Sequence, residues 1–501
     1  MLGLDRRSFS RPDRTKDPAD VNFHSRPDAP SVTRVALTGA AGGFGRTVLV
    51  ALRTHPTQHP AVLCDLDVAA LRRMLLELGY VDDDLVVCAD GLAVRRAVDA
   101  GRIALVDTVD LLDPMAYDVL VEATGVVLVS VRAAIAAIDA SRPVVMVSKE
   151  TESLFGRALA TRARARNVVC TTGAGDQPAN LVELLHWAER LGMEVVAAGK
   201  SSEYDLVFDA ARGTASVLDE SSRAPDLANH WALGDDIAAT LAARKGAVAG
   251  LTLGAAADYC EMAVVANVTG LGVDVPEMHY PIARYRELAD ILRKRSEGGI
   301  LSSTGVLEVF VLLREPGEAS FGGGEFIVVR SRDREVSRVL EQKGHVVSRD
   351  GDHLCIGLPF HLMGLEIPRT IADAATGIAV AEPSGRRLTM VARATMSISG
   401  GTTLTVAGHH HEIAGTAPAL IPSEDAGAEL VPYYLLGGAR LRRHIPAGAT
   451  IRYDDVDGID PILLELAAEE RTTRFPDTCA PDSRTSDTRN SETCFAAEGV
   501  S

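Results

Sequence analysis

Residues 32–52 read VTRVALTGAAGGFGRTVLVAL, and this stretch decides the fold of the first part of the chain. An apolar β-type run, 35–37, enters a glycine-rich turn, and a helical run follows at 46–52. The turn contains Gly39, Gly42, Gly43, Phe44 and Gly45. Asp65 comes twenty residues after Gly45, at the end of a second strand-like run, AVLCDLD. A strand, glycine turn, helix and acid in this order are typical of a dinucleotide site, where backbone amides hold the pyrophosphate and the carboxylate binds the adenosine ribose.

The glycine spacing is Gly-x-x-Gly-x-x-Gly, which is looser than the usual fingerprint, so a glycine-rich turn in another kind of α/β protein is the alternative. Apolar runs that alternate with helical segments continue to about residue 175 and predict a parallel sheet with helices on both faces. The predicted strands are 33–38, 61–65, 84–88, 118–122, 143–148 and 167–172. After the fourth of these strands, Ala123, Thr124 and Gly125 form a turn that we expect beside the nicotinamide.

Composition predicts several domains and excludes some classes of partner. A chain of 501 residues is too long for one core. A net charge of −17 argues against nucleic acid as a partner, and no apolar run is long enough to cross a membrane. Seven scattered cysteines without a Cys-x-x-Cys pair, and an N-terminus without an apolar centre, are typical of a cytoplasmic protein.

The pattern along the chain predicts five segments. The fold class is α/β, with a Rossmann domain followed by an α/β catalytic domain and a small β-rich domain. We place a disordered segment at 1–31, the Rossmann domain at 32–175 and the catalytic domain at 176–385. The β-rich domain follows at 386–460 and a mostly disordered polar tail at 461–501. Apolar helices in the second domain favour a homodimer.

Candidate catalytic groups follow the ends of predicted strands. Lys149, with Glu150 beside it, follows VVMVS and can polarise a carbonyl or hold an oxyanion, unless it is a surface lysine. Asp176 precedes a helix, where it is an N-cap, a base or a metal ligand. Lys200, Glu203 and Asp205 follow another apolar strand, and the alternative for these three is a solvated loop.

Two further groups of polar residues, an acidic pair and a run of histidines, are not expected to form a binding site. Asp258 and Glu261 lie three residues apart on a predicted helix and share one face, which we interpret as an exposed rim rather than a pocket wall. The run 409–411 contains three consecutive histidines, and neighbouring side chains of this kind do not converge on one metal ion.

Taken together, these motifs resemble homoserine dehydrogenase in the first domain. The match is closer to homoserine-dehydrogenase-like proteins with a C-terminal SAF domain, a set that includes 1-deoxy-D-xylulose-5-phosphate reductoisomerase-like enzymes and oxidoisomerases of branched sugar acids. The resemblance rests on GDQPANLVELLHWAERLGMEVVAAGK (175–200), EMAVVANVTGL (261–271), GGILSSTGVLEV (298–309), PFHLMGLEIPRTIA (359–372) and GARLRRHIPAGATIRYDDV (438–456).

The resemblance implies an NAD(P)-dependent enzyme for a small-molecule substrate, with a divalent metal in the reductoisomerases. Asp176 and Lys200 fall in its shared motifs. This chain departs from the reductoisomerase pattern where Glu203 replaces a lysine and where Gly254 and Ala257 replace an aspartate and a lysine. Because these changes remove positive charge, they argue against a phosphorylated substrate.

The expected activity is therefore that of an NAD(P)-dependent oxidoreductase or oxidoisomerase for a small polyhydroxylated or branched sugar-like acid or ketone. Asp65 would bind a ribose hydroxyl and repel a 2′-phosphate, which favours NAD, whereas Arg72 and Arg73 would accommodate NADP. The alternatives are a reductoisomerase of isoprenoid precursor synthesis and a catalytically inactive nucleotide-binding scaffold. A plain homoserine dehydrogenase fits the GDQP segment and the C-terminal region less well.

Overall fold

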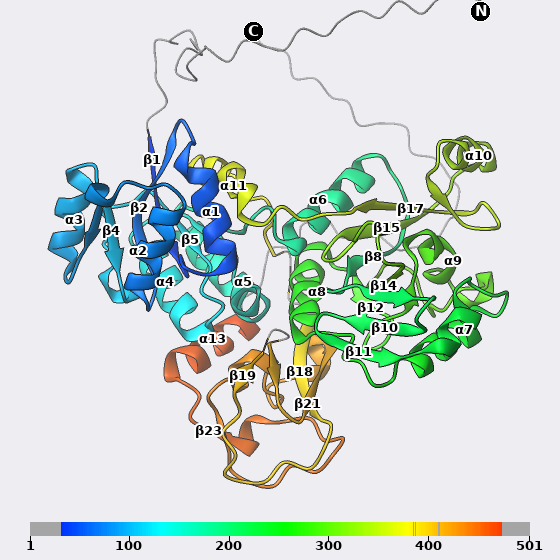
Figure 1. Cartoon of the computed structure of the whole chain (residues 1–501). Helices are drawn as coiled ribbons and strands as arrows, with labels where there is room; N and C mark the ends of the chain where they lie inside the picture. Colours follow the sequence, from blue (N-terminus) through cyan, green and yellow to red (C-terminus); the bar gives the residue numbers. More distant parts are fainter. Residues whose placement is uncertain (1–31, 384, 386, 409–410, 473–501) are drawn as a thin grey trace, which may run out of the picture.

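The computed structural model describes residues 32–383, 385, 387–408 and 411–472. The expected disordered segment 1–31 lies outside them. The first domain and the central domain stand side by side, and a smaller C-terminal domain packs beneath both (Figure 1). The α/β class and the N-terminal Rossmann-like sheet are confirmed.

The first domain contains a seven-stranded parallel sheet in the order β3-β4-β2-β1-β5-β6-β7. The strands are β1 (Thr33–Thr38), β2 (Gln58–Cys64), β3 (Leu85–Val87), β4 (Ile103–Val106), β5 (Val119–Glu122), β6 (Val144–Met146) and β7 (Cys170–Thr172). The strand β4 is absent from the strands we predicted, although its four residues are buried. The helices are α1 (Gly43–Arg53), α2 (Val68–Glu77), α3 (Gly91–Asp99), α4 (Val127–Asp139) and α5 (Lys149–Ala165).

The central domain is built on a mixed sheet whose two faces are both covered. Along β15 (Glu325–Arg330), Ile327 and Val329 pack in the cluster that contains α6 (Gln177–Arg190) and α8 (Ala256–Thr269), whereas Phe326 and Val328 pack on the opposite side with α9 (Leu288–Ile291). The main path of the sheet also includes β8 (Val195–Ser201), β9 (Leu206–Asp209), β10 (Thr214–Val217), β11 (Glu220–Arg223), β14 (Val306–Arg314), β16 (Val346–Val347) and β17 (His353–Leu358). The helices α7 (Ile237–Ala247) and α10 (Arg334–Gln342) lie on the side of the central domain that is remote from the first domain (Figure 1).

After β17 the chain returns to the first domain. Residues 359–366 form a linker, and α11 (Ile367–Ala375) packs against α1. The Gly364 amide donates to Thr47 Oγ1 at 2.9 Å, which fixes the linker beside α1. Pro368 lies in the first turn of α11, where proline is tolerated because the helical amides there have no intrahelical partner.

The C-terminal domain contains one long antiparallel pair, β18 (Leu388–Ala394) with β21 (Thr416–Pro422), and shorter pairs around it. We predicted a polar tail from residue 461, but α13 (Pro461–Thr472) is a helix that packs on α5 of the first domain. There the Ala158 amide donates to Glu470 Oε2 at 2.7 Å. Within the described ranges, no helix combines the length and apolar character needed to span a membrane.

Candidate functional site

A cavity of about 380 Å³ lies at the carboxyl ends of the parallel strands of the first domain. Gly39 and Gly42 line it from the predicted glycine turn, and Ala123 and Thr124 line it from the loop after β5. Asp65 lines it from the end of β2. The structure thus brings together the turn, the loop and the acid that the sequence predicted as one nucleotide site.

The backbone geometry of this groove requires glycine at residue 39. Gly39 has a φ of +62°, and a Cβ atom there would lie 2.2 Å from the Ala123 carbonyl oxygen. The turn and the loop 123–125 therefore approach too closely for any side chain. Gly43 begins α1, where its amide is free of intrahelical bonds, and Phe44 and Gly45 follow in the first turn.

A buried carboxylate fixes the loop 123–125. Thr124 Oγ1 donates to Glu122 Oε1 at 2.6 Å, and Ser130 Oγ donates to Glu122 Oε2 at 2.6 Å. The Gly125 amide donates to Ser148 Oγ at 2.8 Å. Because Ser148 directly precedes Lys149, the loop 123–125 is tied to the start of α5.

The end of the groove that contains Asp65 is acidic. Asp65 Oδ2 accepts a hydrogen bond of 2.8 Å from the Ala41 amide, and Asp107 and Asp110 also line the cavity. Arg132 is the one basic residue among the described lining residues. Arg72 forms an ion pair of 2.8 Å with Asp82 and is absent from the lining, so it does not offset this charge.

Two lysines from different domains meet on one carboxylate. Lys149 begins α5 in the first domain, Lys200 lies on β8 in the central domain, and both ammonium groups contact Glu261 on α8. Lys200 Nζ also lies 2.9 Å from Asp258 Oδ1. The side chains of Lys200, Asp258 and Glu261 are fully buried, whereas Lys149 keeps 19 % of its side-chain surface exposed.

The pKa values in this cluster follow from burial and from the ion pairs. Burial acts to raise the pKa of Glu261, but the ammonium groups of Lys149 and Lys200 outweigh it and lower that pKa to about 2. Burial acts to lower the pKa of both lysines, and the surrounding carboxylates raise it above the ordinary value. All three groups are therefore charged at neutral pH.

The interpretation of Asp258 and Glu261 as an exposed rim is wrong, because both side chains are fully buried beneath the lysines. Asp258 accepts from Ser202 Oγ at 3.1 Å and from the Tyr280 hydroxyl at 3.0 Å. Their three-residue spacing did predict a shared face, but the lysines that contact this face come from α5 and β8, which are distant in sequence.

Asp176 joins the cluster from the other side. It is the N-cap of α6, as one of the alternatives predicted, and its Oδ1 atom also lies 3.7 Å from Lys149 Nζ. Burial raises the pKa of Asp176, and Lys149 acts in the opposite direction. Glu203 Oε2 lies 3.9 Å from Lys200 Nζ and 3.4 Å from Gln177 Nε2, with 37 % of its side chain exposed.

His361 is a site residue that sequence reasoning missed. The structure brings it from the linker to Gly175, where His361 Nδ1 lies 3.3 Å from the Gly175 carbonyl oxygen. A carbonyl only accepts, so the Nδ1 proton points at Gly175 and leaves Nε2 as the acceptor of the neutral ring. A Cβ on Gly323 would lie 2.8 Å from His361 Nε2 and 3.1 Å from Gln177 Nε2, which places both polar groups at one glycine. The position of His361 within PFHLMGLEIPRTIA was the available signal.

Asp205 and Glu150 form ion pairs with other groups and not with the lysines of the cluster. Asp205 Oδ2 accepts from Arg314 Nε at 2.6 Å, and Glu150 Oε1 lies 2.7 Å from His411 Nδ1 of the C-terminal domain. We therefore assign Asp205 and Glu150 no chemical role. Of the three consecutive histidines, 409 and 410 lie outside the described residues.

The carboxylates near the site do not fit a resident divalent metal. In the part of the chain that the structure describes, no three His, Cys, Asp or Glu side chains are grouped as metal ligands. Asp258 and Glu261 are already ion-paired with lysine ammonium groups, and Asp176 is paired with the ammonium group of Lys149. The groove of the first domain, in contrast, fits a dinucleotide, because it lies between the glycine turn before the N-terminus of α1 and the carboxylate of Asp65.

Comparison with known proteins supports an oxidoreductase. Residues 175–367 match the family model described as the catalytic domain of oxidoreductase DRL. This segment holds Asp176, Lys200, Glu261 and His361, and the match confirms the predicted oxidoreductase class. A search of curated proteins finds no match.

Several solved structures are similar to part of this chain. A probable dehydrogenase from Thermotoga maritima is 12 % identical over 69 % of this chain and 90 % of its own, with a TM-score of 0.35. An oxidoreductase from Agrobacterium radiobacter, in complex with NAD+, L-tartaric acid and magnesium, is 14 % identical over 35 % of this chain and 46 % of its own, with a TM-score of 0.25. DOX-P reductoisomerase in complex with magnesium is 17 % identical over 34 % of this chain and 46 % of its own, with a TM-score of 0.25.

Proposed function

We propose that this oxidoreductase uses NAD and transfers a hydride between the nicotinamide and an oxygen-bearing carbon of a small polyhydroxylated acid or ketone. One observation carries the proposal: the Gly125 amide bonds to Ser148 at 2.8 Å, immediately before Lys149. The loop expected beside the nicotinamide and the most exposed ammonium group of the cluster are thereby held together.

Lys149 is the group that we assign to the reacting oxygen. It is the lysine with an exposed surface, while Lys200 is fully buried and saturated by carboxylates. The Lys149 ammonium would donate to the substrate oxygen and stabilise negative charge that develops there. Lys200 then acts as a positioning residue that holds Glu261, and Glu261 in turn holds Lys149.

Asp176 is the group that we assign to the proton. Its carboxylate lies beside Lys149, and burial raises its pKa toward the range in which a base works at neutral pH. When an alcohol is oxidised, the hydroxyl proton passes to Asp176 as the hydride leaves the same carbon. Bound NAD supplies the hydride acceptor. His361, Gln177 and Glu203 offer further hydrogen bonds, which suit the hydroxyl groups of a polyol.

The charge of the site disfavours a phosphorylated substrate. Glu203 stands where the reductoisomerase pattern has a lysine, and its carboxylate would repel a phosphate. We expect no turnover of deoxyxylulose phosphate, which separates this proposal from a reductoisomerase of isoprenoid precursor synthesis.

The acidic ribose end of the groove supports NAD over NADP. Titration of the purified chain with NAD, NADH, NADP and NADPH, followed by calorimetry, tests this choice. We expect the NAD pair to bind at least about tenfold more tightly than the NADP pair, because a 2′-phosphate would face Asp65. Asp65→Ala should reduce that preference, and Asp83→Ala, at an exposed aspartate outside the groove, should not. Equal affinity for both pairs would contradict the assignment.

Lys149→Met tests the chemistry separately from cofactor binding. In a panel of sugar acids and polyols with NAD, we expect the variant to keep its affinity for NADH and to lose turnover by about a hundredfold or more. Binding of NADH by the parent chain without turnover of any substrate would favour a nucleotide-binding scaffold instead.

A further inference from the structure

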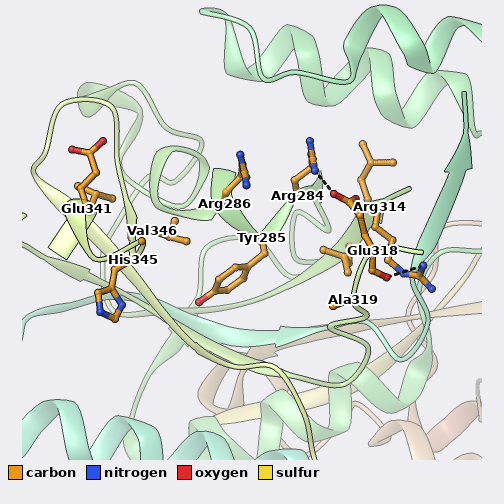
Figure 2. A pocket seen from close by; sticks show the side chains of 13 residues that line it. Arg284, Tyr285, Arg286, Arg314, Glu318, Ala319, Glu341, His345 and Val346 are labelled. Carbon is orange, nitrogen blue, oxygen red and sulfur yellow. Dashed lines mark hydrogen bonds and ion pairs between the residues drawn. The ribbon is translucent and has the colours of Figure 1, made fainter. Parts of the chain in front are cut away.

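The central domain has a second cavity, of about 540 Å³, whose lining shares no residue with the nucleotide groove. Three separate segments form it: the turn at Tyr285, the end of β14 with the loop after it, and the corner between α10 and β16. Figure 2 shows these segments around one space, with Tyr285 between the two sides. A cavity of this size accommodates a small metabolite.

Its wall is basic, although the whole chain has a net charge of −17. Arg284, Arg286 and Arg314 line it together with two acids, Glu318 and Glu341. Arg284 forms an ion pair with Glu318 at 2.6 Å, and Arg314 with Asp205 at 2.6 Å. Within the described ranges, the exposed Arg286 side chain has no hydrogen bond or ion pair. Arg284 and Arg286 extend toward the same side in Figure 2.

Aromatic rings lie directly behind this wall. The Tyr285 ring stacks on Phe321 with 4.6 Å between centroids, and the Arg284 guanidinium lies 4.5 Å from the centre of the Trp231 ring. The stacking fixes Tyr285 as a rigid apolar surface beside the arginines.

We propose that this cavity is an effector site for a small metabolite that bears a carboxylate or phosphate group. Arg286 supplies the unpaired charge, and Arg284 reaches the anion by exchanging its bond to Glu318 for one to the ligand. Planar guanidinium groups bind both kinds of anion in a bidentate manner.

One loop connects this cavity to the proposed active site. Glu318 and Ala319 line the cavity, and the chain runs from them to Gly322 and Gly323. A Cβ on Gly322 would lie 2.9 Å from the Glu203 carbonyl oxygen, and one on Gly323 would lie 2.8 Å from His361 Nε2. Release of Glu318 would therefore shift a loop that packs against two residues of the site. This coupling rests on the proposed function, whereas anion binding itself does not.

Trp231 provides a direct readout of binding. The chain has two tryptophans, and in a Trp187→Phe background the remaining fluorescence comes from Trp231 beside Arg284. Inorganic phosphate and citrate are titrated separately, with sodium chloride at matched ionic strength as the reference. We expect a saturable fluorescence change with at least one of the two anions, and comparison of their affinities distinguishes a phosphate ligand from a carboxylate ligand.

Two arginine variants make the test specific. Arg286→Ala should weaken the binding at least about tenfold, since a charge-assisted bond is lost. Arg96→Ala removes an exposed arginine on α3 and should leave the affinity for the anion unchanged. The proposed site is overturned if the parent chain shows no fluorescence change, or a change that does not saturate. It is also overturned if the two variants bind the anion equally well. Hydrogen exchange of residues 318–326 should change with bound phosphate or citrate, and unchanged exchange there overturns the effector role.

Discussion

Glu261 is the residue on which the ion-pair cluster depends, because both lysines contact its carboxylate inside a fully buried environment. Glu261→Gln removes the charge and leaves two neighbouring ammonium groups with fewer partners. We expect a loss of about 3–5 kcal/mol in the free energy of unfolding, the usual cost of breaking a buried ion pair. Urea denaturation of the variant measures this loss.

Glu77→Gln provides the control for that experiment. Glu77 lies on the surface of α2, where its ion pair with Arg46 spans 3.5 Å between exposed side chains. A change within about 0.5 kcal/mol is expected for such a pair. If the two variants were equally stable, Glu261 would not hold the cluster together.

The same residues show how far the sequence predicted the site. Lys149 and Asp176 follow β6 and β7 of the first sheet, where the parallel topology brings strand ends together, whereas Lys200 and Glu203 lie at the end of β8 in the central sheet. Asp258 and Glu261 had no comparable signal, since a helix face is identified as buried only when its partner is known. His361 lies on a linker whose position depends on the packing of Gly364 against α1.

At the scale of single elements, α13 connects the end of the described chain to the first domain. Leu466 is 1 % exposed and Leu464 is 40 % exposed on this one helix. Leu466→Asp should destabilise the protein by about 3 kcal/mol or more, because a carboxylate would be buried without a partner. Leu464→Asp should stay within about 0.5 kcal/mol. Thermal unfolding of the two variants compares them directly, and equal melting temperatures would show that α13 is not docked.

Elements that end at glycine, proline or a change of hydrophobic period were predictable, which is why most strands of the first sheet were found. The strand β4 was missed because its four apolar residues, between Arg102 and Asp107, are too few to separate strand from loop. The helix α13 was missed although its first half is apolar, because the surface of α5 that it covers is not evident from the local sequence.

At the scale of the whole molecule, His411 and Glu150 join the C-terminal domain to the first domain. Their hydrogen bond of 2.7 Å raises the pKa of His411 above its ordinary value of 6.5. A raised pKa means that the stabilisation is complete below the ordinary value and is lost as the pH rises through the raised one.

His411→Gln should therefore destabilise the protein more at about pH 5.5 than at about pH 8.5. The difference should stay below about 1 kcal/mol, because 42 % of the His411 side chain is exposed and solvent screens the pair. Melting temperatures at the two pH values measure it. In a Glu150→Gln background the pH dependence of the His411→Gln effect should disappear, and its persistence would contradict this origin.

The central domain is connected to the first domain by two stretches of chain, one before α6 and one after β17, and these touch where His361 meets the Gly175 carbonyl oxygen. A domain that is connected to its neighbour by two adjoining segments rotates about the axis through those segments. Asp176 and His361 lie beside that axis. A rotation of the central domain would therefore displace them least, and it would displace side chains farther from the axis most. The proposed base therefore lies where a rotation of the central domain against the first domain would change its position least.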